Sequence, residues 1–302
     1  MVWFSINIYT HYSPTDPDAR ISVKHGKARK LNYLSQLGVD TAHHVITHIS
    51  ADFADKKDNQ SLQAVVDKLK FRLNSNSLFW QNLLADAGYS SGENYAFLEE
   101  KGIKAYIPPH GTYKGGPDGF TYDKENDCWI CPQGKKVTFR KTKTEKGTLK
   151  KYYFTRRKDC SHCPLRSACI GRSHEKRIGI TYFNEQYGRT IARINSAGAQ
   201  KLKKKRMATV EPVLGTLINF LGMRKINTIG IKQANKVMLM VAIAYNIKKY
   251  MHFIDKEIEA NKNAKQLAND SHKLATIQGH TQGLIKAKQK LNVKLNNLKE
   301  VQ

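Results

Sequence analysis

The sequence predicts a mixed α/β fold that is interrupted once by a cysteine-rich insertion. Strand-like and helix-like patterns alternate between residues 31 and 107, in an order that suits helices packed on a sheet. From about residue 110 to 180 the composition changes to frequent glycine, dense lysine and arginine, and all five cysteines. Helical patterns then resume. A chain of 302 residues is long enough to bury one full core around such an embedded module.

The first half of the core begins with two predicted strands and a helix. Residues 31–40 and 43–53 have strand character, and the second of these segments is rich in Val, Ile and Thr. Residues 58–73 are predicted to form a helix, because their apolar residues recur at helical spacing. The apolar positions are Leu62, Val65, Val66, Leu69 and Leu73.

The next elements are shorter. Residues 83–86 are predicted to be a buried strand that breaks at a glycine, and residues 92–101 a helix closed by Gly102. Residues 103–107 form another strand in this interpretation, because two prolines follow it directly.

Two apolar helices and a polar tail are predicted beyond the insertion. Residues 209–222 and 232–250 both place apolar side chains on one helical face. Residues 255–302 are rich in Lys, Asn and Gln with sparse leucines, which indicates a solvated helix or a partly disordered tail.

The net charge indicates a polyanionic partner. The chain carries 51 Lys and Arg against 25 Asp and Glu, a formal charge of +26. DNA or RNA is the first candidate, because neutralising phosphates releases counterions. A soluble basic protein or a ribosome-associated one is the alternative. No apolar run approaches the roughly 20 residues that span a membrane, and residues 1–12 lack the features of a signal peptide.

One basic run stands out within this surplus. It precedes Glu211 by only a few residues, which favours phosphate contact over a merely solvated helix face. Its cations are Lys201, Lys203, Lys204, Lys205 and Arg206.

The cysteines follow a metal-binding pattern. Cys128 and Cys131 form one C-x-x-C pair, Cys160 and Cys163 form a second, and Cys169 follows. Paired knuckles of this kind are typical of zinc-ribbon-like sites, where thiolates surround a tetrahedral ion. Free thiols and disulfides are the alternatives, and His162 and His174 are additional candidate ligands. A structural metal would allow a loop-rich insertion to fold without an apolar core of its own.

Two carboxylates have matching neighbourhoods. Asp86 ends an apolar strand-like run, and Glu211 lies at the start of the predicted helix 209–222. Carboxylates at a strand end and a helix start can share a divalent metal. The alternative is structural: a turn residue that caps a helix, and a first-turn acid favoured by the helix dipole.

Three histidines lie within or beside the second predicted strand. His44 and His48 would be roughly 13 Å apart along a strand, at about 3.3 Å per residue, so they could not share an ion. We expect these two residues and His43 to be structural or to lie on the surface.

Six short segments, taken in order, resemble the bacterial insertion-sequence transposases of the DDE type. Their order along the chain also follows that family. The segments are residues 13–20 (SPTDPDAR), 85–91 (ADAGYSS), 131–135 (CPQGK), 160–169 (CSHCPLRSAC), 210–215 (VEPVLG) and 244–249 (AYNIKK).

The resemblance implies a fold and a division of the chain. The fold would be α/β, a ribonuclease-H-like mixed sheet flanked by helices, interrupted by a zinc-ribbon-like insertion and followed by a helical C-terminal tail. In this division, residues 1–12 are a remnant or substitute N-terminal strand, 13–109 the first part of the core and 110–181 the insertion. Residues 182–250 are the helical second part of the core with the catalytic Glu, and 251–302 the tail.

The resemblance also implies an activity, metal-dependent cleavage and transfer of DNA strands with Mg²⁺ or Mn²⁺. Asp86 would be the second catalytic Asp and Glu211 the catalytic Glu. The family's cysteine positions correspond to Cys131, Cys160, Cys163 and Cys169, which leaves Cys128 as an extra residue. The expected partners are transposon-end and target DNA and a second copy of the chain, in the bacterial cytoplasm at the nucleoid and not at a membrane.

One member of the family's acidic triad has no counterpart. The first catalytic Asp lies upstream of the segment 13–20 in such transposases, and residues 1–12 contain no acidic residue. Asp16 and Asp18 belong to that later segment. We therefore expect an N-terminally truncated and nearly inactive transposase. The alternatives are a non-catalytic nucleic-acid-binding protein that inhibits transposition, and a zinc-ribbon protein bound to RNA.

Overall fold

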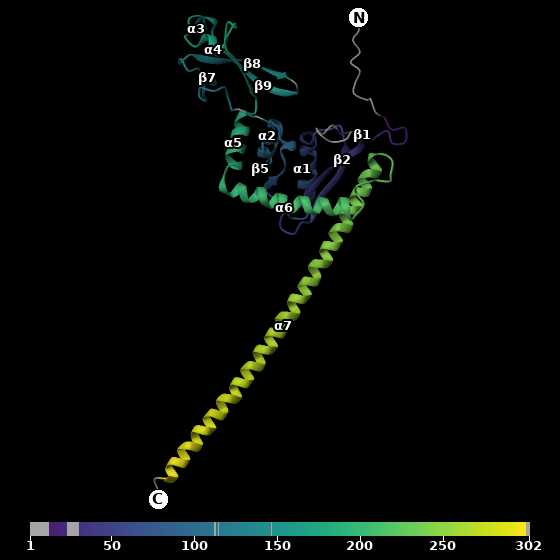
Figure 1. The fold of residues 1–302 in the computed structure, drawn as a ribbon, viewed down its shortest axis with the longest axis vertical. Coiled ribbons are helices and arrows are strands. Elements are labelled where there is room, and N and C mark those ends of the chain that lie inside the picture. The colour runs from purple at the N-terminus through teal and green to yellow at the C-terminus, as the bar shows by residue number, and fades with distance from the viewer. Residues whose placement is uncertain (1–11, 23–29, 112, 114, 146, 300–302) are drawn as a thin grey trace. The chain divides into compact units, whose positions relative to one another are not determined.

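The computed structural model describes residues 12–22, 30–111, 113, 115–145 and 147–299 (Figure 1). The chain divides into two units, Met1–Ala242 and Ile243–Gln302, and each is considered by itself. The first unit combines helices with three small sheets, so the mixed α/β class predicted from the sequence is confirmed.

The first sheet is antiparallel and has the strand order β1-β2-β3. It consists of β1 (Arg20–Ile21), β2 (Leu31–Val39) and β3 (Ile46–Phe53). Strands β2 and β3 pair from Tyr33 opposite Phe53 to Val39 opposite Ile46, with an irregularity next to Gly38. Both long strands were predicted.

Strand β3 begins three residues later than predicted because a turn occupies its expected start. The carboxylate of Asp40 accepts hydrogen bonds from the backbone N–H of Ala42 at 3.0 Å and of His43 at 2.7 Å. His44 has a φ of 58°, a left-handed conformation that a strand cannot contain.

The second sheet is a parallel pair, β4 (Asn82–Leu84) and β5 (Lys104–Tyr106). Between them the chain forms a short 3₁₀ turn, η1 (Ala87–Tyr89), and helix α2 (Gly92–Glu100), while helix α1 (Asp58–Asn74) precedes them. The two strands and two helices were predicted with ends that differ by no more than two residues, whereas η1 was not predicted. They enclose the apolar core Leu62, Val66, Tyr95, Leu98, Ile103, Ala105 and Ile107.

The described strands that precede the insertion form two sheets rather than the single mixed sheet that the sequence predicts. Strand β1 pairs only with Leu31 and Asn32, so the rest of β2 is paired on one side alone within the described residues. In the same part of the chain, β4 is paired only with β5. Helix α6 (Ala197–Asn219) contacts both β2 and β4. A single sheet would need a joining strand, and none of the described strands takes that position.

The insertion has its own sheet, antiparallel with strand order β10-β9-β8-β7-β6. A small apolar core of Trp129, Val137, Tyr153 and Ile178 lies within it. The expectation of a loop-rich insertion without a core was therefore wrong. The strands are β6 (Thr121–Asp123), β7 (Cys128–Ile130), β8 (Lys136–Glu145), β9 (Thr148–Phe154) and β10 (Arg177–Thr181), with the short helices α3 (Arg157–Ser161) and α4 (Arg166–Cys169) between β9 and β10.

Three helices follow the insertion: α5 (Asn184–Ile194), α6 and α7 (Ile231–Lys299). Helix α6 begins twelve residues before the predicted start at 209, with Ser196 as its N-cap. The prediction of a helix over 232–250 is confirmed, and the tail is helical as far as Lys299. None of the helices in the described part of the chain is both long enough and apolar enough to cross a bilayer.

Candidate active site and cysteine cavity

Asp86 lies two residues after the end of β4, whereas the sequence predicts it as the last residue of that strand. It is the N-cap of η1, and its Oδ1 accepts a hydrogen bond from the backbone N–H of Gly88 at 2.9 Å. The side chain is exposed. The structural role considered for this residue, a capping turn, is therefore present, and the carboxylate remains open to solvent for a further ligand.

A second carboxylate, that of Asp58, lies beside Asp86. Asp58 is the first residue of α1, and its Oδ2 would lie 2.8 Å from a Cβ placed on Gly88. The same Cβ would lie 3.0 Å from Oδ1 of Asp86. Both carboxylates therefore face Gly88, and only a residue without a side chain leaves them this space.

The pKa of Tyr89 is affected by the same two carboxylates. Burial of its ring raises the pKa of the phenol well above its usual value, and the nearby charges of Asp58 and Asp86 raise it further. Its hydroxyl donates to Oε1 of Gln36, a residue of β2 that is only 1% exposed. The Tyr89 side chain therefore joins η1 to the first sheet as a neutral phenol.

The sequence offered no signal for Asp58. An acid in the first turn of a helix is ordinary, because the helix dipole favours it there. Only the packing of α1 against η1 brings it to Asp86, and that contact joins segments almost thirty residues apart.

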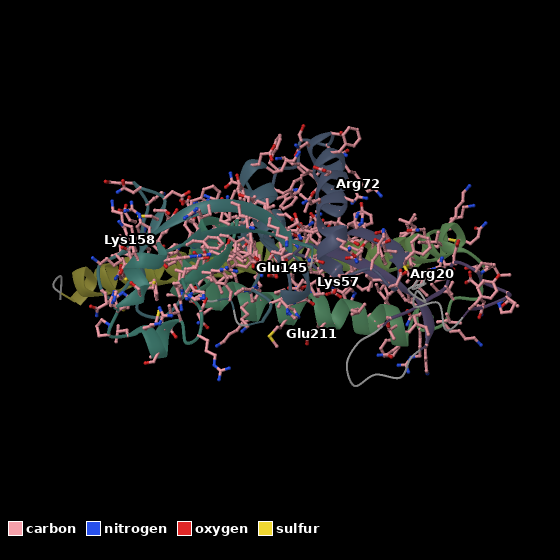
Figure 2. The ribbon with its side chains drawn as sticks, turned by 90° about the horizontal axis from the view of Figure 1, so that it is seen from above. Arg20, Lys57, Arg72, Glu145, Lys158 and Glu211 are labelled. Atoms are coloured by element: carbon pink, nitrogen blue, oxygen red, sulfur yellow. The ribbon has the colours of Figure 1, made fainter. Side chains whose placement is uncertain are left out.

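Glu211 lies on α6, but not where the sequence placed it. It is the fifteenth residue of the helix rather than a first-turn residue, so the helix-dipole interpretation of this acid was wrong. Its side chain is exposed (Figure 2), whereas Thr209, Val213 and Leu217 form the buried side of α6. Pro212 follows it inside the helix and deprives the Ala208 carbonyl of its usual partner.

The carboxylates are not assembled into a complete metal site. Within the part of the chain that the structure describes, no three His, Cys, Asp or Glu side chains form a group arranged to hold a metal ion. The structure brings Asp58 and Asp86 together, while Glu211 occupies the exposed side of α6.

Asp16 and Asp18 have structural partners. Asp16 accepts hydrogen bonds from the hydroxyl of Tyr33 and from the backbone N–H of Gly230, the latter at 3.1 Å. Asp18 accepts one from the N–H of Ile231 at 3.0 Å. These two carboxylates thus satisfy N–H groups at the start of α7.

The basic run lies on the same helix as Glu211. Four of its cations are exposed and the fifth, Arg206, is half-buried. Lys204 precedes Glu211 by seven residues, so both side chains leave α6 on nearly the same face, two turns apart. Within the described residues none of the five cations has an ion-pair partner.

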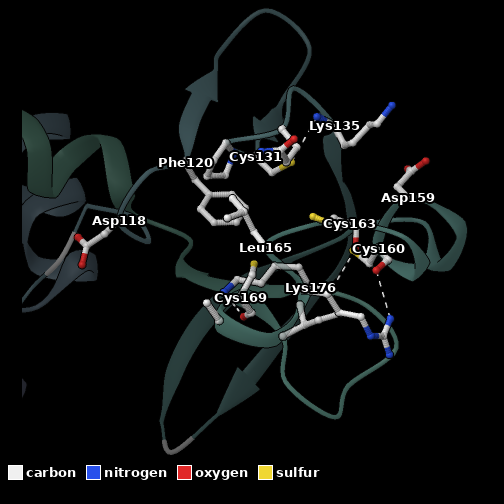
Figure 3. A pocket seen from close by; sticks show the side chains of 16 residues that line it. Asp118, Phe120, Cys131, Lys135, Asp159, Cys160, Cys163, Leu165, Cys169 and Lys176 are labelled. Atoms are coloured by element: carbon white, nitrogen blue, oxygen red, sulfur yellow. Dashed lines mark hydrogen bonds between the residues drawn. The ribbon is translucent and has the colours of Figure 1, made fainter.

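Four cysteines surround one cavity of about 240 Å³ in the insertion (Figure 3). They are Cys131, Cys160, Cys163 and Cys169. Cys128 lies outside this cavity, 2% exposed within β7, and neither His162 nor His174 lines it. All five cysteines are free thiols in the structure, with no disulfide between them.

Turns and short helices position these sulfurs. The backbone N–H of Lys135 donates to Sγ of Cys131 at 3.3 Å, across a turn that contains Gly134 at φ 71°. Cys160 lies on α3, and Cys169 ends α4. Four thiolates are the type of donor that Zn²⁺ prefers, but within the described residues they are not gathered into a metal-binding group.

The comparison with protein families matches residues 130–251 to the transposase DDE domain. This segment includes Glu211 and the four cavity cysteines, and it confirms the resemblance seen in the sequence. The region is consistent with the catalytic region of a DDE transposase. Such transposases act on DNA and generally use divalent metal ions. Neither the comparison with curated proteins nor that with solved structures gave a match.

Proposed function

We propose that the protein is a DDE-type transposase, in which Asp86 and Glu211 bind Mg²⁺ or Mn²⁺ and DNA ends are the substrate. The observation that carries the proposal is the transposase match over 130–251, which includes Glu211 on a helix that contacts the strand before Asp86. The order antiparallel strands, helix, parallel strands supports a ribonuclease-H-like core.

Within the site, the chain's own residues have distinct tasks. Asp86 and Glu211 supply oxygen ligands, and Asp58 is the carboxylate that the structure places nearest to Asp86. The bound metal would supply the charge that activates a water or 3′ hydroxyl and stabilises the leaving oxygen. The exposed cations on α6, two turns from Glu211, would hold phosphates near the scissile bond.

We further propose that residues 1–302 alone cut DNA poorly. Only two carboxylates correspond to the acidic triad, and Asp16 and Asp18 are engaged at the start of α7. Two ions about 3.5–4 Å apart require bridging oxygens. A centre that lacks one bridging carboxylate should hold the second ion weakly.

A nicking assay on supercoiled plasmid with Mg²⁺ or Mn²⁺ tests both statements. We expect DNA binding with only trace nicking, and we expect Glu211→Gln to remove that trace. Robust nicking that disappears in Glu211→Gln would keep the transposase centre but overturn the claim of low activity, and Asp58→Asn would then show whether Asp58 is the missing ligand.

A non-catalytic nucleic-acid-binding protein that inhibits transposition is the second candidate. Glu211 is exposed, and no group of three metal-ligating side chains forms within the described residues, which favours this second candidate. This candidate predicts salt-dependent DNA binding and no metal-dependent nicking under any condition. Trace nicking that depends on Glu211 would exclude it.

For the insertion we propose a structural Zn²⁺ held by Cys131, Cys160, Cys163 and Cys169. The support is that these four side chains line one cavity while Cys128 is packed elsewhere. The metal would fix α3 and α4 against the sheet, which its small apolar core holds only in part.

We propose that the chain forms a homodimer through the part of α7 that belongs to the second unit. Ile243, Ile247 and Tyr250 of α7 are 57%, 54% and 65% exposed, at the alternating spacing of a coiled-coil seam. Burying such a stripe against a second copy removes apolar surface from water. Light scattering should give a dimer that Ile247→Asp converts to a monomer, with Lys248→Asp as the control. A monomeric wild type would contradict this.

A further inference from the structure

The insertion has a hollow of about 520 Å³ on its surface, distinct from the cysteine cavity. Four cations from two segments surround it. Arg140 and Lys141 come from β8, while Arg156 and Arg157 come from the end of β9 and the start of α3. All four side chains are exposed.

These four cations are not neutralised by the protein. Within the described residues none of them has a carboxylate partner. The one acid that lines the hollow, Glu175, pairs with Arg177 at 3.1 Å. The hollow therefore carries four exposed cations beside one acid that is already paired, and this excess of positive charge attracts anions.

Two other lysines of the insertion's sheet do have carboxylate partners. Lys150 pairs with Glu145 at 2.8 Å, and Lys151 with Asp127 at 3.3 Å. The four cations that line the hollow differ from these two lysines in having no carboxylate partner within the described residues.

The backbone at the base of the hollow is held firmly. Thr155 is 2% exposed and forms two hydrogen bonds with Lys176: its N–H donates to the Lys176 carbonyl at 3.1 Å, and its Oγ1 accepts from the Lys176 N–H at 2.9 Å. Its Oγ1 also lies 3.1 Å from Sγ of Cys160. Arg156 and Arg157 therefore extend from a fixed point, which reduces the entropy cost of binding.

The aromatic rings nearby are already covered. The guanidinium of Arg177 lies 5.4 Å from the ring centroid of Phe154, which lines the hollow. The ring of Tyr152 lies against Gly179, where an added Cβ would be 3.0 Å from it. Bases stack on free aromatic faces, and Phe154, the aromatic residue in the lining, already has a guanidinium over its ring.

From this geometry we propose that the hollow bounded by Arg140, Lys141, Arg156 and Arg157 binds the phosphate backbone of duplex DNA. Three guanidiniums and one ammonium suit phosphate oxygens, since arginine forms bidentate, charge-assisted hydrogen bonds with them. This inference rests on the proposed function, because DNA is the proposed substrate. It adds a second anchor on the insertion, separate from the cations of α6.

The test is DNA binding by the full chain as a function of salt concentration, with a duplex and a single strand of equal length. The variant Arg156→Gln/Arg157→Gln should weaken duplex binding about tenfold and reduce the log–log salt slope by about 2, one unit for each phosphate that the variant no longer neutralises. The control Lys136→Gln/Arg172→Gln removes the same charge from exposed positions of the insertion outside the hollow and should change the slope little.

A charge-retaining variant and a measurement of stability distinguish the possible outcomes. Arg156→Lys/Arg157→Lys retains the charge and should restore most of the slope, and unfolding curves of each variant identify any loss of fold. Equal losses of affinity in the hollow variant and the control, or a stronger effect on the single strand, would overturn the proposal. Nicking by the wild type is measured in a separate assay, so absent nicking and absent hollow binding are separate failures. A wild type that binds no DNA would instead overturn the proposed function.

Discussion

The carboxylates of Asp58 and Asp86 both lie beside Gly88, with one oxygen of each within 3.0 Å of the point where a Cβ would be. Asp58 begins α1 and Asp86 is the N-cap of η1, so two elements distant in sequence meet at a glycine. Two like charges this close repel each other, and a divalent cation relieves the repulsion. The pair is therefore the part of the proposed metal site that the structure already assembles.

Substitution of this glycine should disrupt the pair. In Gly88→Ala the added methyl group meets both carboxylates, so we expect Mn²⁺ affinity to fall by about tenfold, which is about 1.4 kcal/mol. Isothermal titration calorimetry measures this. The matched control is Gly215→Ala on α6, where an added Cβ meets no atom within 4 Å. This control substitution should raise the stability of the helix by up to about 1 kcal/mol. Unchanged Mn²⁺ affinity in Gly88→Ala would show that the pair is not a metal site.

The cysteines should divide into four that bind zinc and one that does not. We expect about one Zn²⁺ per chain by elemental analysis, reduced in Cys169→Ser and unchanged in Cys128→Ser. The reason is that Cys169 lines the cavity, whereas Cys128 is packed in β7. Cys128→Ser should instead lower thermal stability modestly, since it places a hydroxyl in a buried position. Equal zinc content in both variants would contradict the assignment.

His48 gives the first unit a dependence on pH. Burial, together with the charges of Arg72 and Lys68, lowers the pKa of His48 from an ordinary value of 6.5 to about 4. The unfolded chain therefore binds a proton at a higher pH than the folded one. This contribution to stability is present above about pH 6.5 and is lost progressively as the pH falls to about 4.

Urea unfolding between pH 4 and 7 measures this effect. We expect His48→Gln to flatten the pH dependence, and His174→Gln, an exposed position, to leave it unchanged. A wild-type profile that matches His48→Gln would mean that His48 titrates normally in the folded protein. His48 is buried, which is compatible with the prediction that the three histidines are structural or lie on the surface.

The spacing of apolar residues predicted the helices and strands of the core well and those of the insertion poorly. The helix at 58–73 was found because Leu62, Val66 and Leu69 recur on one face, and these side chains are buried. Strands β8 and β9 were missed because their solvent face is lysine-rich and only Val137 and Tyr153 are buried. A strand with so few buried positions lacks the alternation by which strands are recognised.

Tertiary contacts account for the other differences. The first half of α6 was missed because its lysines resemble a solvated linker, although Ser196 caps it and Ala199 is buried. Asp58 was missed because its neighbour Asp86 is far away in the chain. Sequence alone did separate Cys128 from the other four cysteines, through the family's cysteine positions, and the cavity has the same four.

The central claim is that Asp86 and Glu211 bind a catalytic divalent metal, and direct Mn²⁺ binding tests it most closely. Electron paramagnetic resonance titration of the full chain counts bound Mn²⁺, and thiolate sites do not compete for this hard ion. We predict one tightly bound Mn²⁺ per chain, with affinity reduced at least about tenfold in Asp86→Asn and in Glu211→Gln. Unchanged stoichiometry and affinity in both variants would contradict the account.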